Sequence, residues 1–104
     1  MINNKISMRR KKNTELLNDL SGIFKALANP SRLQIFNMLQ NGKEMNVTEI
    51  YIKLQADQPT VSHHLSIMKN SGILETRREA QSIFYFINKK NLKTVISYLN
   101  EVID

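Results

Sequence analysis

The sequence predicts a mainly α-helical fold with one small β-hairpin, in the order four helices, two strands and a last helix. Apolar residues recur at helical spacing in five segments, and two β-prone runs between residues 73 and 87 flank a short polar stretch. Asn, Asp, Pro and Gly stand where helices should begin and end. At 104 residues the chain can bury one core but not two, so we predict a single domain over residues 13–104.

The first two helices are predicted from leucine spacing and from one Asn-Pro pair. The first begins near Thr14 and ends before Asn29. Its apolar stripe consists of Leu16, Leu17, Leu20, Ile23, Phe24 and Leu27. Asn29 can cap the second helix, with Pro30 in the first turn, where a missing N–H costs nothing. Asn41 and Gly42 then end that second helix.

The third and fourth helices are predicted from their caps. The third begins at Asn46, and Glu49 stands three residues later, as in a capping box. The fourth follows Asp57 as cap, with Pro59 in its first turn, and ends at Gly72. Its buried side is predicted to consist of Val61, Leu65 and Met68.

A hairpin and a last helix complete the pattern. Residues 73–78 and 82–87 are β-prone runs separated by Glu79, Ala80 and Gln81. An amphipathic helix then runs to the end of the sequence. Two short helices joined by a tight turn and followed by a hairpin form a winged helix-turn-helix.

Composition places the chain in an ordinary class. The hydrophobic fraction of 41% and the charged fraction of 23% are typical of a soluble domain. No apolar run reaches the roughly 18 residues of a membrane span, and no apolar segment follows the polar, basic first residues. We therefore expect a cytoplasmic protein without a signal peptide or a membrane partner. The absence of cysteine excludes disulfides and thiolate metal sites.

The net charge of +6 is distributed unevenly. Five of the fifteen basic residues lie in residues 1–12, which contain no acidic residue. This segment is predicted to be a flexible basic arm. Residues 13–104 hold ten basic and nine acidic residues, so bulk charge alone says little about a polyanionic partner there.

The outward face of the fourth helix is the first candidate DNA-binding surface. Advancing 100° per residue from Gln58 places the small polar residues opposite the buried side. The candidate contacts are Gln58, Thr60, Ser62, His63 and Ser66. Small outward residues let a helix enter the major groove, where hydroxyls and imidazole can meet base edges or phosphates. The alternative is that this face is simply a polar surface.

The hairpin tip is the second candidate surface. Arg77, Arg78 and Gln81 lie around it, and two guanidinium groups can reach a flanking minor groove or its phosphates. The alternative is surface ion pairing of the arginines with Glu75 and Glu79.

The two histidines do not predict a metal site. Adjacent helical residues point about 100° apart, and no cysteine or third histidine completes a set of ligands. His64 borders the core and is predicted to pack there, whereas His63 points outward.

Three segments of the sequence resemble the ArsR/SmtB family of bacterial repressors. They are residues 26–35 (ALANPSRLQI), residues 60–65 (TVSHHL), and residues 71–74 (SGIL) continuing through Arg77-Arg78-Glu79 to Phe84-Tyr85. The likeness covers about residues 16–103. It implies a homodimer that binds a two-fold-symmetric operator in double-stranded DNA and represses transcription until a signal releases it.

The resemblance also implies roles for single residues. Gln58, Thr60, Ser62 and His63 match family positions on the recognition helix that touch DNA. On the hairpin, or wing, the matching residues are Arg77, Arg78 and Gln81. Two positions depart from the family pattern. Pro59 replaces a small polar residue, and Ala80 stands where the wing commonly turns through glycine. Because a left-handed turn at Ala80 would be strained, we expect a longer or differently shaped wing.

The family's metal sensors are not reproduced. Many members carry a Cys-x-Cys element where this chain has residues 44–49, and others place His and Asp ligands on the last helix, which here offers only Glu101 and Asp104. We therefore expect no metal site and no cofactor, and the sequence does not indicate an effector.

The first and last helices carry wide apolar stripes. The residues predicted for a dimer interface are Leu16, Leu20, Leu92, Val95, Ile96, Leu99, Val102 and Ile103. The alternative is that both stripes only close the core of one chain.

Two other function classes, an enzyme and a protein-interaction module, fit the sequence less well than DNA binding. An enzyme would need a nucleophile–base pair or paired acids in a cleft, and the two histidines have no identifiable partner for such work. A winged-helix protein-interaction module would need an aromatic or aliphatic outward face instead of a polar one. The sequence therefore favours a sequence-specific DNA-binding repressor.

Overall fold

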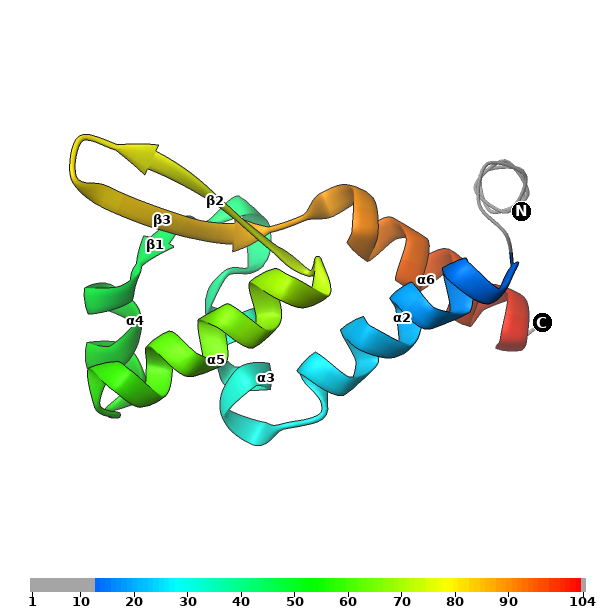
Figure 1. Ribbon diagram of the computed structural model, residues 1–104, viewed down its shortest axis with the longest axis horizontal. Coiled ribbons are helices and arrows are strands. Elements are labelled where there is room, and N and C mark those ends of the chain that lie inside the picture. The colour runs from blue at the N-terminus through cyan, green and yellow to red at the C-terminus, as the bar shows by residue number, and fades with distance from the viewer. Residues whose placement is uncertain (1–12, 104) are drawn as a thin grey trace.

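The computed structural model describes residues 13–103. Its elements are α2 (Asn13–Leu27), α3 (Pro30–Met38), the 3₁₀ helix η1 (Gln40–Gly42), β1 (Met45–Asn46), α4 (Val47–Leu54), α5 (Gln58–Ser71), β2 (Leu74–Glu79), β3 (Ser82–Ile87) and α6 (Lys89–Ile103) (Figure 1). The predicted order of four helices, a hairpin and a last helix is confirmed, and η1 and β1 are additional short elements.

The starts of α3, α4 and α5 and the end of α5 follow the predicted caps. The predicted end of the second helix at Asn41 and Gly42 is wrong: α3 ends at Met38, and the chain turns through η1 before the left-handed Asn41 breaks the helical path. The Asn29 side chain accepts a hydrogen bond from the Arg32 N–H at the start of α3, and Asn46 and Glu49 form a complete capping box on α4. At the start of α5 the Asp57 side chain accepts from the Thr60 N–H. Gly72 ends α5 in the left-handed conformation, with φ of +91°. These bonds satisfy N–H groups that a helix start leaves without a partner.

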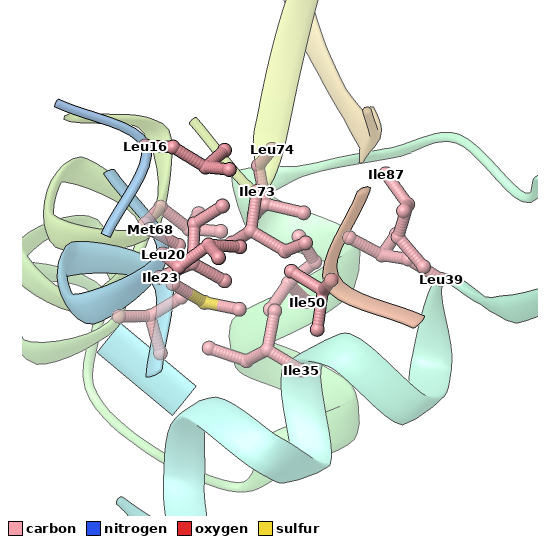
Figure 2. Packing of buried hydrophobic residues seen from close by; sticks show 13 residues of the cluster. Leu16, Leu20, Ile23, Ile35, Leu39, Ile50, Met68, Ile73, Leu74 and Ile87 are labelled. Atoms are coloured by element: carbon pink, nitrogen blue, oxygen red, sulfur yellow. The ribbon is translucent and has the colours of Figure 1, made fainter. Parts of the chain in front are cut away.

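The core lies where the four N-terminal helices meet the base of the hairpin (Figure 2). Ile35 of α3 and Ile50 of α4 are fully buried there, as is Ile73 just before β2. The fully buried residues of α5 are Val61, Leu65 and Met68, as predicted. Burying a large aliphatic side chain contributes about 1.5–3 kcal/mol, so α5 is held firmly along one side.

The sheet has three strands in the order β1-β3-β2, with both pairings antiparallel. The strand β1 pairs Met45 with Tyr85 and Asn46 with Phe84. The sequence does not predict β1, because two residues are too few to show the alternation of a strand. The pairing ties the start of α4 to the wing, since Asn46 is both a strand residue and the cap of that helix.

The expectation of a longer or differently shaped wing is wrong. The strands β2 and β3 stay in register up to Glu79 opposite Ser82, so the turn contains only Ala80 and Gln81. Ala80 takes the left-handed conformation itself, with φ of +55°. The six-residue ladder of cross-strand bonds holds the turn closed, and a non-glycine residue in this region costs on the order of 1–2 kcal/mol.

Figure 1 places α2 and α6 at the end of the molecule away from the wing tip. Among residues 13–103, no helix is long and apolar enough to cross a membrane. The predicted basic arm, residues 1–12, lies outside the described residues.

Candidate nucleic-acid interface

The helix α5 presents the predicted polar face to solvent. The predicted contact residues Gln58, Thr60, Ser62, His63 and Ser66 are all exposed, and Ser62, His63 and Ser66 lie on the side away from the core. Among them, Gln58 and Thr60 lie in the first turn, the end of a recognition helix that reaches base edges. The face is small enough to fit a major groove and offers hydroxyl, amide and imidazole groups.

The Thr60 hydroxyl also has a structural role that the sequence does not predict, because it binds the carboxylate that caps α5. It donates a 2.7 Å hydrogen bond to Asp57 Oδ1, while the Thr60 N–H donates to Asp57 Oδ2 at 3.2 Å. The bond from the Thr60 hydroxyl lowers the pKa of Asp57 most, and the bond from the Thr60 N–H lowers it further. The Asp57 carboxylate is therefore charged at neutral pH. Thr60 therefore keeps only acceptor capacity for a base or a water molecule.

The two histidines lie as predicted, one exposed and one half-buried. His63 points to solvent beside Ser62 and Ser66. His64 lies with its Nδ1 3.1 Å from Arg32 Nη1. The pKa of His64 is lowered, mainly by burial. Electrostatic repulsion from Arg32 contributes less, and that from His63 contributes least. At neutral pH His64 is uncharged and turned toward the protein, so His63 is the imidazole available to DNA.

The two wing arginines differ in their surroundings. Arg77 Nε pairs with the Glu44 carboxylate, and Arg77 Nη1 lies 3.1 Å from Glu79 Oε1. Its guanidinium carbon also stands 4.7 Å from the centre of the Phe84 ring. The two carboxylates, Glu44 first, raise the pKa of Arg77. The ion-pairing alternative therefore describes Arg77, with Glu44 as a partner that sequence analysis missed.

Arg78 is the wing arginine open to a ligand. It is exposed and has no ion pair in the part of the chain that the structure describes. Successive strand residues face opposite sides, so Arg78 shares the face of Leu74, away from Arg77. Gln81 is exposed in the turn beside it. The wing tip thus offers one guanidinium and one amide.

The predicted interface residues of the first and last helices fall into two groups. The first group, Leu16, Leu20 and Val95, is buried within the single chain, and Leu92 is half-buried. The second group lies exposed on α6: Ile96, Leu99, Val102 and Ile103. Leu17 of α2, which the predicted set left out, is 46% exposed. On α2 and α6, the exposed apolar surface therefore consists of Leu17 and the α6 group, whereas Leu16, Leu20 and Val95 have little surface left to offer.

An open groove of about 820 Å³ continues this apolar surface toward the base of the wing. Phe36, Phe86, Leu92 and Ile96 give it an apolar lining, and Glu44, the partner of Arg77, lies at its edge. Within residues 13–103, no three His, Cys, Asp or Glu side chains gather to hold a metal ion.

The helices α4 and α5 are joined by the three-residue turn 55–57, and a hairpin stands beside them. With the outward polar face of α5, this arrangement defines a winged helix-turn-helix protein. The model of the arsR family of bacterial regulatory proteins matches residues 29–76, which contain α3, the helix-turn-helix and the first part of the wing.

Relatives extend the match beyond this segment. The HTH-type transcriptional regulator MJ1325 of Methanocaldococcus jannaschii is 40% identical over 77% of this chain and 90% of its own. The transcriptional repressor PagR of Bacillus anthracis is 37% identical over 83% of this chain and 86% of its own. The chain belongs to the arsR family and is a transcriptional regulator, not an enzyme.

A solved structure agrees with the fold. The homodimeric winged helix-turn-helix DNA-binding domain of Mb0332 from Mycobacterium bovis has a TM-score of 0.73 and 31% identity. The match covers 90% of this chain and 86% of that one.

Proposed function

We propose that this regulator binds an inverted repeat in double-stranded DNA as a homodimer, and that it represses transcription there. The exposed face of α5, from Gln58 to Ser66, carries the proposal. It is polar and carries no Lys, Arg, Asp or Glu side chain, and the opposite side is fixed in the core. PagR, a relative, is named a repressor.

The homodimer is supported by the exposed apolar surface at the end away from the wing tip. Ile96 is 48% exposed, Leu99 41% and Ile103 79%, which is unusual for large aliphatic side chains in a helix with a buried face. The similar domain of Mb0332 is described as homodimeric. A two-fold dimer places recognition helices about 34 Å apart, on successive turns of one side of the duplex.

Each part of the surface has a distinct role in this proposal. Gln58 reads a base edge from the first turn of α5, and Ser62 and His63 meet bases or phosphates along the groove. Arg78 reaches the flanking minor groove or its phosphates, while Arg77 braces the wing. The basic arm adds affinity by counterion release, and binding to chromosomal DNA occurs in the cytoplasm.

The test begins with a duplex selected by the protein from a randomised library. We expect Ser62→Ala and His63→Ala each to cost about 1–3 kcal/mol per half-site on this duplex, measured by fluorescence anisotropy. Ser21→Ala, the same change on the exposed surface of α2, is the matched control and should have no effect. Equal losses on random duplex would show that Ser62 and His63 contact only phosphate. No binding to any duplex at low salt would contradict the proposal.

The arm is tested by deleting residues 1–12. Each phosphate contact that is lost should flatten the log–log salt dependence by roughly 0.9. Sequence preference should stay largely intact. A collapse of preference would show that the arm reads bases.

The dimer is tested by sedimentation of Ile96→Glu. The side chain is exposed in the single chain, so the substitution should leave the fold intact and shift a dimer to a monomer. A wild-type chain that stays monomeric at micromolar concentration would contradict the dimer.

A further inference from the structure

Arg32 connects three helices. Its backbone N–H bonds to the Asn29 cap of α3, its Nε donates a 2.6 Å bond to the Ala26 carbonyl near the end of α2, and its Nη1 lies 3.1 Å from His64 Nδ1 on α5. The Ala26 carbonyl belongs to the last turn of α2, where carbonyls lack partners within the helix. A cation is favourable there.

The contact with His64 has a defined direction. A guanidinium group only donates, so His64 Nδ1 is the acceptor and the ring proton lies on Nε2. The lowered pKa of His64 keeps the ring in this neutral form at pH 7. Because Nε of the same planar group is bonded to the Ala26 carbonyl, the direction from which Nη1 approaches His64 is restricted.

This contact adds a directional bond from another helix to the apolar packing of α5. Val61, Leu65 and Met68 hold α5 along its buried side, but the hydrophobic effect that holds them is not itself directional. Among residues 13–103, the other side-chain hydrogen bonds formed by α5 residues, those of Thr60 and Ser71, stay within the helix and its ends. The bond from Arg32 to His64 reaches α5 from another helix.

We propose that Arg32 is a positioning residue that sets the orientation of the recognition helix relative to α2, and thereby the half-site spacing that the dimer accepts. The inference rests on the proposed function, because spacing has meaning only for a dimer on an inverted repeat. The two-fold axis of a dimer repeats any rotation of α5 in both chains, so a loosened contact changes the separation of the two helices. Arg32 itself needs no contact with DNA for this role.

The experiment compares two probes, the duplex selected by the wild-type protein and the same duplex with one base pair inserted between its half-sites. The insertion moves one half-site by about 3.4 Å and rotates it by roughly 35°. We expect the wild-type protein to prefer the selected duplex by at least about tenfold. In Arg32→Met and His64→Leu this ratio should fall to about threefold or less, while affinity for random duplex stays unchanged.

Two variants serve as matched controls. His64→Asn keeps an acceptor for Arg32, because its Oδ1 is bonded to Cγ as Nδ1 is in histidine, and should keep the wild-type ratio. Lys93→Met removes one exposed positive charge on α6 and should also keep it. A merely structural role of Arg32 would lower the unfolding temperature without changing the ratio of the two affinities.

The outcomes separate this inference from the proposed function. If a folded Arg32→Met or His64→Leu protein prefers the selected duplex over the lengthened one as strongly as the wild-type protein does, Arg32 is not a positioning residue. The proposed function would not be affected by this result. Unfolding of both variants would also overturn the positioning role, since the contact would then serve the fold itself. A wild-type protein that binds neither probe would instead overturn the proposed function.

Discussion

The recognition helix and the wing both present candidate DNA contacts, but the protein holds them in different ways. The helix α5 is anchored by three fully buried side chains and by caps at both ends. The wing is anchored at its base by Leu74 and Ile87, and toward its tip by cross-strand pairs and the contacts of Arg77. Substitutions on the buried side of α5 should therefore affect folding. Substitutions at the wing tip should affect DNA binding with little effect on folding.

The largest expected effect is on stability, and it comes from the helix. Leu65→Ala removes a fully buried side chain and should lower the free energy of unfolding by about 3 kcal/mol. Ile83→Ala, at a wing position that is 39% exposed, should cost less than about 1 kcal/mol. Denaturant unfolding measures both. Equal losses would show that the wing is part of the same cooperative core.

The two wing arginines should contribute differently to DNA binding. Arg78→Ala should weaken binding to the selected duplex roughly tenfold, because it removes a guanidinium that has no ion pair among residues 13–103. Arg77→Ala should weaken it less, since that side chain is engaged by Glu44 and Glu79. Fluorescence anisotropy at one fixed salt concentration compares them. A larger loss in Arg77→Ala would show that the ion pairs open on DNA.

A smaller effect is expected at the wing turn. Ala80→Gly relieves the left-handed strain and should stabilise the protein by about 0.5–1 kcal/mol. Ala28→Gly is the control, because Ala28 does not have a positive φ and gains nothing from the extra freedom. Thermal unfolding of the two variants should shift in opposite directions. A destabilised Ala80→Gly protein would contradict the strain.

The smallest expected effect is a pH dependence from His64. Its pKa in the folded protein is lower than the ordinary value of 6.5, so below that pH the unfolded chain binds more protons. Stability should therefore fall as the pH is lowered through 6.5, until the folded form also becomes protonated. His64→Gln should remove this part of the dependence in denaturant unfolding at pH 7 and pH 5. An unchanged slope in that variant would assign the effect to other groups.

Local signals predicted most of the fold. Asn29, Asn46 and Asp57 each combine a cap with a following apolar pattern, and each lies at the start of a helix in the structure. The buried side of α5 followed from the spacing of Val61 and Leu65. The conformation of the wing turn cannot be predicted from the sequence alone. The sequence shows the strain expected at Ala80, but not the cross-strand bonds between β2 and β3 that outweigh this strain.

The remainder of the site depends on contacts between distant parts of the sequence. Arg77 and Glu44 are 33 residues apart, and Arg32 and His64 are 32 apart, so no local pattern pairs them. The spacing of the leucines in α2 also does not determine which of them are buried. Their stripe is wider than one buried face, and only the position of neighbouring helices decides that Leu16 turns inward and Leu17 outward.

The strand order β1-β3-β2 has a consequence for self-association. The short strand β1 covers part of one side of β3, which leaves β2 as an outer strand with backbone groups open to pairing. β2 carries four charged side chains, Glu75, Arg77, Arg78 and Glu79, which would have to lie against those of any second copy added there. Charged side chains on an outer strand oppose such sheet extension, so the residues that shape the wing also protect the protein from aggregating through it.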